Sequence, residues 1–127
     1  MTGEDTKTLW WNDETNTIMM IDQTKLPDTL EIIEVKTVDR LAEAIKKLEV
    51  RGAPALGVAG AFGVALSAVN CPSDIEFLET VTADAELLRA TRPTAVNLSW
   101  GIHKVLRSME NLPPEMARFL AVTAAKT

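Results

Sequence analysis

Cysteine and histidine are nearly missing from this 127-residue chain, which contains one of each. A lone cysteine, Cys71, can form neither an internal disulfide nor a cysteine-based metal cluster, and it favours a reducing compartment. A nucleophilic Cys71 would need a base nearby, but His103 lies far away in the sequence, and no carboxylate or second histidine stands at a useful spacing from that histidine. We therefore interpret Cys71 as a structural or loop residue and His103 as a surface residue.

Basic residues are in the minority, with 13 lysines and arginines against 18 aspartates and glutamates and a net charge of -5. This balance disfavours general nucleic-acid binding through a basic surface, although single arginines can still bind a small anion. The first five residues are polar and acidic, and we find no apolar run that reaches the length of a membrane span, or of a signal sequence with a basic flank. The sequence predicts a soluble cytoplasmic protein that binds neither nucleic acid nor membranes.

The glycine motifs of nucleotide-binding proteins are also absent. Gly57, Gly60 and Gly63 lie in one apolar stretch, but no G-x-G-x-x-G turn follows a strand, and no lysine follows the glycines as a Walker motif requires. We therefore reject both nucleotide-binding readings. Glycine inside a helix costs about 1 kcal/mol relative to alanine, so we expect these three glycines to allow the close approach of another backbone.

The front of the chain, residues 1–36, has the pattern of a β meander. Three extended runs, at 9–11, 17–21 and 30–35, are separated by polar or proline-containing segments. We expect a small antiparallel sheet of about three strands. Trp10 and Trp11 are neighbours on the first strand and must point to opposite faces, so we expect one of them to pack against the core.

From residue 37 to residue 127 the apolar spacing becomes helical, which predicts a bundle of about five helices and an α+β fold class. Together with residues 1–36 we expect this bundle to form one domain. The second helix should be buried on most sides, because it is apolar all round. The predicted helices are 37–49 with Thr37 as N-cap, 54–68, one that follows the capping box Ser73–Glu76 and runs to about residue 90, one from about residue 94 that ends before Pro113, and one from residue 115 to the end.

Apolar side chains at helical spacing support the later helices and mark a core face on the fourth. For the third helix these are Ile75, Leu78, Ala85 and Leu88. For Trp100 we weigh stacking on a ligand against filling space between helices, and we expect the second. The core face of the fourth helix is predicted from Ala95, Leu98, Ser99, Ile102, Val105, Leu106 and Met109, and the last helix carries Met116, Phe119, Leu120 and Val122.

Two short segments place an arginine beside a proline at an expected helix start: Arg51-Gly52-Ala53-Pro54 and Thr91-Arg92-Pro93-Thr94. The first turn of a helix has unpaired N–H groups and a partial positive charge, and an arginine adds planar donors suited to phosphate or carboxylate. The two segments together therefore suggest a site for a small phosphorylated molecule. The alternative is that each proline only starts a helix and each arginine is solvated.

Three stretches, in order, resemble the amino-terminal third of the methylthioribose-1-phosphate isomerases: 21–27 (IDQTKLP), 50–59 (VRGAPALGVA) and 91–98 (TRPTAVNL). The resemblance implies isomerisation of 5-methylthioribose 1-phosphate to 5-methylthioribulose 1-phosphate, a step of methionine salvage, without a metal or other cofactor. It also implies that Arg51, Gly52, Ala53 and Arg92 contact the substrate. The full-length family members are expected to be dimers.

The resemblance further implies that this chain contains no catalytic residue. The catalytic cysteine and aspartate of the family belong to a carboxy-terminal Rossmann-like domain that this sequence lacks, and Cys71 does not match the family's cysteine motif. We expect a truncated chain that is inactive alone, exposes an apolar patch and self-associates. Two alternatives within the superfamily stay open: a ribose-1,5-bisphosphate isomerase, and a non-catalytic regulatory subunit like the alpha, beta and delta subunits of initiation factor 2B.

Overall fold

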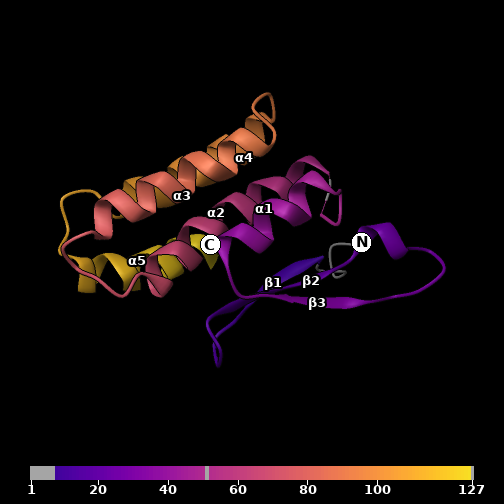
Figure 1. The fold of residues 1–127 in the computed structure, drawn as a ribbon, viewed down its shortest axis with the longest axis horizontal. Helices are drawn as coiled ribbons and strands as arrows, with labels where there is room; N and C mark the ends of the chain where they lie inside the picture. Colours follow the sequence, from indigo (N-terminus) through magenta and orange to yellow (C-terminus); the bar gives the residue numbers. More distant parts are fainter. Residues whose placement is uncertain (1–7, 51, 127) are drawn as a thin grey trace.

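The computed structural model describes residues 8–50 and 52–126 (Figure 1). The amino-terminal part of the chain forms an antiparallel sheet in the order β1-β2-β3, as predicted. The strands are β1 (Leu9–Asn12), β2 (Thr17–Ile21) and β3 (Ile32–Val35). The third strand begins two residues later than expected. A short 3-10 helix, η1 (Gln23–Lys25), follows β2 and was not predicted.

One face of the sheet is covered by helices. Trp11, Ile18 and Val35 are opposite one another on the three strands, and all three are buried. The ring of Trp11 packs on Phe62, with ring centroids 5.8 Å apart. Trp10 points to the other face and is half-buried, which confirms the expectation for this tryptophan pair.

Five helices follow, and the predicted α+β class is confirmed. They are α1 (Val38–Lys46), α2 (Ala53–Asn70), α3 (Phe77–Thr91), α4 (Val96–Ser108) and α5 (Pro114–Lys126). The hydroxyl of Thr37 accepts a hydrogen bond from the Arg40 N–H at 3.1 Å, so the predicted N-cap of α1 is confirmed. This helix ends earlier than expected, because Leu48 adopts a left-handed conformation with φ 65° and turns the chain.

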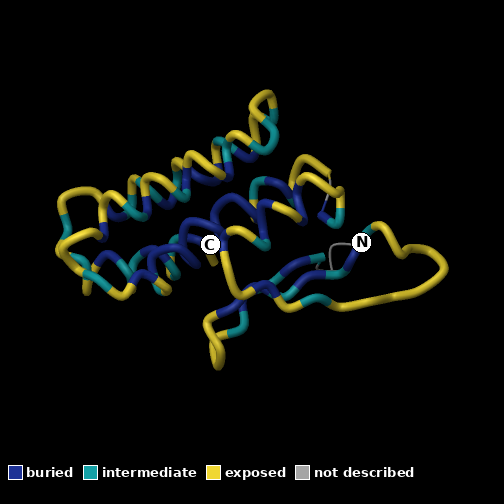
Figure 2. Tube along the Cα trace, in the orientation of Figure 1, coloured by how far each residue is buried: buried dark blue, intermediate teal, exposed yellow. Residues whose placement is uncertain are grey.

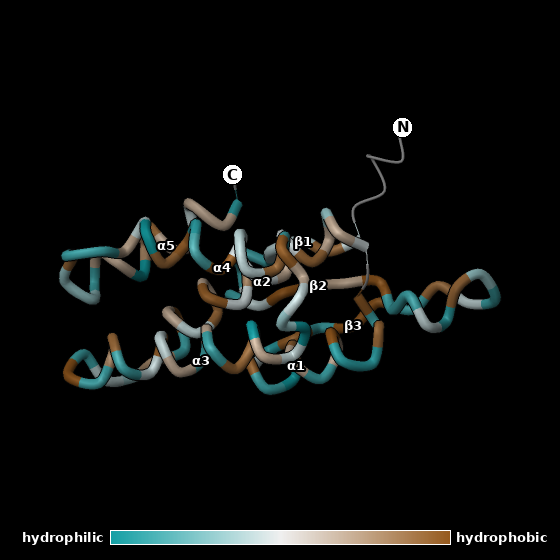
Figure 3. The backbone as a smooth tube through the Cα atoms, turned by 90° about the horizontal axis from the view of Figure 1, so that it is seen from above, coloured by the Kyte–Doolittle hydropathy of each residue, from teal (hydrophilic) through white to brown (hydrophobic). Residues whose placement is uncertain are grey.

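The centre of the bundle is α2, which contacts the other four helices and the sheet. Seen from above, α1 and α3 lie on one side of it and α4 and α5 on the other (Figure 3). Figure 2 shows α2 buried along most of its length. Among the described residues it is the one helix long and apolar enough to cross a membrane, so our statement that no run reaches that length was wrong. Because 61% of its 18 residues are buried inside the fold, α2 is packed as a core helix.

The glycines of α2 allow close packing, as expected, but not all against backbone. A Cβ added to Gly57 would lie 3.3 Å from the Asn97 carbonyl oxygen, and one added to Gly60 would lie 2.6 Å from that of Leu98. Both contacts are with α4. Gly63 instead meets side-chain atoms of Leu88 and Leu41, so for this glycine the expectation of a neighbouring backbone was wrong.

Not all the apolar residues that indicated α3 and α5 are buried in them. Of the residues that indicated the third helix, Ile75 and Leu78 are 94% and 75% exposed. The helix begins only at Phe77, and it buries Phe77, Val81, Ala85 and Leu88. The predicted capping box is half formed, since the Ser73 hydroxyl accepts a hydrogen bond from the Glu76 N–H. In α5 the buried residues are Ala117, Ala121 and Ala125.

Large apolar side chains consequently face outward on three helices. Phe119 is 71% and Met116 is 51% exposed on α5. We expected Trp100 on α4 to fill space between helices, but this side chain is 64% exposed. The ammonium group of Lys104 lies over its ring, 5.7 Å from the ring centroid. Exposure of apolar side chains on the isolated chain was expected, and self-association in solution stays a prediction.

Candidate functional site

The starts of α2 and α4 lie at the same end of the bundle. Gly57 is adjacent to Asn97, and Ala61, one turn further along α2, is adjacent to Gly101, one turn further along α4. Because the residue numbers rise together along both helices, the two helices run parallel. Their partial positive charges are therefore directed to the same end.

The start of α2 is open to a ligand. Gly52 is the N-cap, with φ 96°, a backbone conformation that favours glycine, and it provides no side-chain cap. Pro54 lies in the first turn and has no N–H to satisfy. The N–H groups of Ala53 and Ala55 therefore have no carbonyl partner inside the helix. Gly52, Ala53 and Pro54 are all exposed, so this helix start can accept an anion.

The start of α4 differs from the prediction, because the helix begins at Val96 and not at Pro93 or Thr94. Arg92 follows α3 as its C-cap, with φ -145° and ψ 78°, since a residue before proline is disfavoured in a helical conformation. The Ala95 N–H donates to the Arg92 carbonyl oxygen at 3.0 Å, which closes a tight turn between the helices. The Arg92 guanidinium forms no hydrogen bond or ion pair with any residue that the structure describes.

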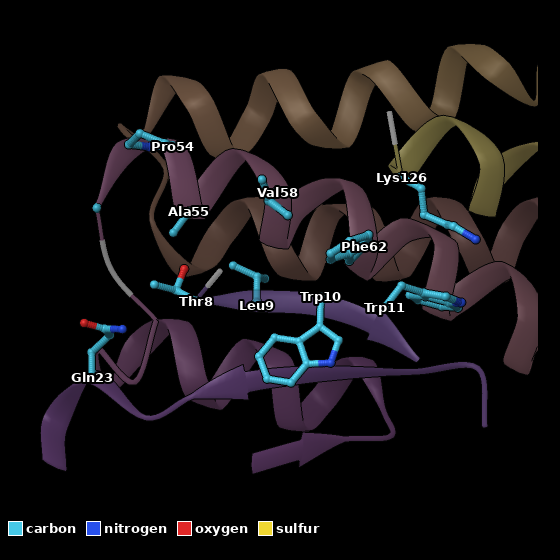
Figure 4. A pocket seen from close by; sticks show the side chains of 11 residues that line it. Thr8, Leu9, Trp10, Trp11, Gln23, Pro54, Ala55, Val58, Phe62 and Lys126 are labelled. Carbon is cyan, nitrogen blue, oxygen red and sulfur yellow. The ribbon is translucent and has the colours of Figure 1, made fainter. Parts of the chain in front are cut away.

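A groove of about 650 Å³ runs between β1 and the exposed side of α2 (Figure 4). Gly52 and Pro54 lie at one end, and Leu9, Val58 and Phe62 form its apolar walls. A second groove, between α2 and α4, shares Pro54, Val58 and Phe62 with the first. It adds residues of α4 and continues the concave surface around α2; these are Asn97, Trp100 and Lys104.

The predicted site residues are brought together only in part. Gly52 lines the β1–α2 groove and Ala53 is the first residue of α2, next to it. Arg92 lines neither groove. Arg51 lies outside the described residues, so the predicted convergence of the two guanidinium groups stays a prediction.

Gln23 is a groove residue that the sequence analysis did not single out. It follows Asp22, which is 4% exposed and accepts hydrogen bonds at Oδ1 from the Thr24 N–H (2.9 Å) and hydroxyl (2.6 Å). These bonds from Thr24, together with the positive charges of Lys25 and Arg40, lower the pKa of the Asp22 carboxyl, against the opposing effect of burial. Gln23 lies in the stretch 21–27, and the resemblance of this stretch to the isomerase family is the sequence signal that points to it.

Replacing Asp22 with alanine should destabilise the fold by about 1 kcal/mol, because the buried turn loses the acceptor of two hydrogen bonds. Since the folded state lowers the pKa of Asp22, its stabilisation is complete above the ordinary value of 3.8 and is lost as the pH falls through the lower folded value. Urea unfolding of both proteins at about pH 7 and about pH 2 tests this. A difference in stability that stays constant over this range would contradict it.

The other candidate residues carry no site. Cys71 is buried, and its thiol donates to the Ser73 carbonyl oxygen at 3.3 Å, which agrees with a structural role. His103 is exposed on α4, as interpreted, with Nδ1 2.9 Å from the Ser99 carbonyl oxygen. Within residues 8–50 and 52–126, no three histidine, cysteine, aspartate or glutamate side chains gather closely enough to hold a metal ion.

Comparison with known proteins gives consistent matches. The chain is 45% identical over 125 residues to a putative methylthioribose-1-phosphate isomerase of Methanosarcina acetivorans, which covers 94% of this chain and 35% of the relative. A crystal structure described as translation initiation factor eIF-2B, subunit delta, from A. fulgidus superposes with a TM-score of 0.87 at 45% identity, over 94% of this chain and 35% of that one. The 5-methylthioribose 1-phosphate isomerase of Pyrococcus horikoshii superposes with a TM-score of 0.86 at 35% identity, over 94% and 34%.

The chain thus spans about a third of the length of these relatives. A sequence profile of the Initiation factor 2 subunit family matches residues 49–119, which include all of α2, α3 and α4. The match extends over more than half of the chain, and the chain belongs to the Initiation factor 2 subunit family.

Proposed function

We propose that this chain is the amino-terminal, substrate-binding part of an isomerase that converts 5-methylthioribose 1-phosphate to 5-methylthioribulose 1-phosphate. One observation carries the proposal: α2 and α4 start at the same end of the bundle, without side-chain caps, and the start of α2 opens into a groove. The identity to relatives that are named as this isomerase supports the choice of substrate.

The proposed ligand fits the chemistry of this end of the bundle. Uncapped N–H groups at a helix start, with the partial charge of the helix, favour a phosphate group. The backbone N–H of Ala53, next to the exposed Gly52, can approach the ligand closely because Gly52 has no side chain. Arg92, whose guanidinium is without a partner in the described chain, and Arg51 would add charge-assisted hydrogen bonds to the phosphate.

The reaction itself needs groups beyond those described. A phosphate on the anomeric oxygen blocks simple opening of the sugar ring to a free aldehyde, so a general acid must assist ring opening before hydrogen moves between neighbouring carbons. In this proposal the chain holds the sugar phosphate, and the acid and base come from the two thirds of the relatives' length that it does not span. We place the complete enzyme in the cytoplasm, as a homo-oligomer.

Calorimetric titration with 5-methylthioribose 1-phosphate tests the proposed site. We expect Arg92→Ala, and separately Arg51→Ala, to weaken binding about tenfold or more, because each removes charge-assisted hydrogen bonds to the phosphate. The matched control is Arg107→Ala, at the opposite end of α4, where the side chain is exposed and the affinity should not change. Unchanged affinity after both replacements at 51 and 92 would refute the phosphate site.

A regulatory role is the second candidate, because a structural neighbour is described as an initiation factor subunit. A module of that kind needs no sugar-phosphate site. If the unaltered chain binds neither 5-methylthioribose 1-phosphate nor ribose 1,5-bisphosphate, the regulatory candidate gains support. Tighter binding of the bisphosphate would instead favour the other isomerase of the superfamily.

A further inference from the structure

We propose that Gln23 contacts a sugar hydroxyl of the ligand in the β1–α2 groove. The inference rests on the proposed function and adds to it a residue that distinguishes a sugar phosphate from phosphate alone. It assigns a role to the stretch 21–27, which the phosphate site leaves unexplained.

The main chain holds Gln23 at the start of α2. Asp22 caps η1 through Thr24, and the Gln23 N–H donates to the Glu49 carbonyl oxygen at 2.9 Å. Glu49 lies three residues before Gly52, so this bond connects the turn to the segment that leads into α2. The Glu49 carboxylate pairs with Arg40 at 2.7 Å, which anchors that segment to α1. The position of Gln23 is therefore set by contacts that do not use its own side chain.

The side-chain amide of Gln23 is available to a ligand. It is half-buried and makes no hydrogen bond to any residue within 8–50 and 52–126. Gln23 lines the same groove as Gly52 and Pro54. Figure 4 places its amide near Thr8, at the end of the groove where α2 begins, with Leu9 and Val58 farther along. A half-buried amide that has no partner among the described residues, at this end of the groove, points to a polar ligand.

The chemistry of the amide selects the hydroxyl and not the phosphate. The amide NH₂ group donates hydrogen bonds and the amide carbonyl oxygen accepts them. A sugar hydroxyl both donates and accepts, so it can pair with either group. A phosphate can only accept from the amide and is better served by N–H groups and guanidinium. With phosphate at the uncapped start of α2, a hydroxyl of the attached sugar would meet Gln23.

The test uses nuclear magnetic resonance on the ¹⁵N-labelled chain. Gln23 is the only glutamine in the sequence, so its NH₂ signals form a single pair, distinct from those of the asparagines. Titration with 5-methylthioribose 1-phosphate should shift this pair, and inorganic phosphate should shift the amides of the first turn of α2 but not this pair. Gln23→Ala should weaken sugar-phosphate binding about fivefold to tenfold. Its affinity for inorganic phosphate should not change.

Thr29→Ala is the matched control, because Thr29 is exposed on the same loop and lies outside the groove. It should bind both ligands as the unaltered chain does. If the sugar phosphate shifts the α2 amides while the Gln23 pair stays still and Gln23→Ala binds normally, the inference is overturned and the proposed function stands. An equal loss of both ligands in Gln23→Ala would also overturn it, since the change would then act on the start of α2. No shift with either ligand would overturn both proposals.

Discussion

Replacing Gly101 with alanine is expected to destabilise the fold by about 3 kcal/mol or more. A loss of this size is a large part of the total stability of a small domain, and it can prevent folding. The added Cβ would lie 2.0 Å from the Gly57 carbonyl oxygen and 3.2 Å from the Ala61 backbone nitrogen. Both atoms belong to the backbone of α2, so neither can rotate away as a side chain could. The helices would have to separate, which loosens the most extensive helix–helix contact of the fold.

The control for this prediction is Gly57→Ala, on the facing helix. Both changes bring the same gain in helix propensity, about 1 kcal/mol. The Cβ at position 57 would lie 3.3 Å from the Asn97 carbonyl oxygen, so a shift of a few tenths of an ångström accommodates it. Urea unfolding followed by circular dichroism should rank Gly101→Ala as far more damaging than Gly57→Ala. Equal stability of the two variants would contradict the close parallel packing of α2 and α4.

The second prediction is that the purified chain alone has no isomerase activity. Enzymes typically turn over roughly 1–1000 times per second, and we expect the chain alone to give no ketose phosphate above the uncatalysed background. The physical reason is that ring opening and hydrogen transfer need an acid and a base in contact with the sugar. Of the described residues, those that line the β1–α2 groove include no carboxylate, histidine or cysteine. The ionisable group among them, Lys126, is paired with Asp13 at 2.9 Å.

A coupled assay for ketose phosphate measures this prediction. The positive control is the full-length relative from Pyrococcus horikoshii, which is described as this isomerase. The chain should be assayed at a concentration that its ligand titration shows to be saturating, so that weak binding does not imitate inactivity. Turnover by the chain within the ordinary enzyme range would refute the division of roles between this part and the rest of the relatives' length.

Much of the fold could be predicted from local patterns. The strands alternate, Thr37 is placed to cap α1, and Pro54 marks the start of α2. Each of these residues acts on positions a few residues away in the sequence, through backbone geometry or a short hydrogen bond. Its effect can therefore be predicted without knowledge of the tertiary contacts. The start of α4 was predicted too early, because a proline next to an arginine fits a turn as well as a helix start. In the structure this segment forms a turn, closed by the hydrogen bond from the Ala95 N–H to the Arg92 carbonyl oxygen.

The buried faces of the later helices could not be predicted in the same way. In α5 the large side chain of Phe119 faces outward and the small side chain of Ala121 faces inward. Hydrophobicity alone would favour burial of the larger side chain. Three alanines on one stripe allow α5 to lie close to α2 and α4, and the hydropathy of single residues does not reveal that spacing. The same limit applies to Trp100, which is large and apolar and yet exposed.

The candidate site shows the same division. Gly52 and Pro54 at a helix start are features of the chain itself, because φ preferences and the missing N–H of proline are properties of single residues. The amino-acid sequence alone therefore determined the α+β class, the central apolar helix and the open start of α2. Only the tertiary structure decided that α2 and α4 run parallel, that β1 forms the second wall of the groove, and that Gln23 lies in it. These relations depend on contacts between segments far apart in the chain, which local preferences do not encode.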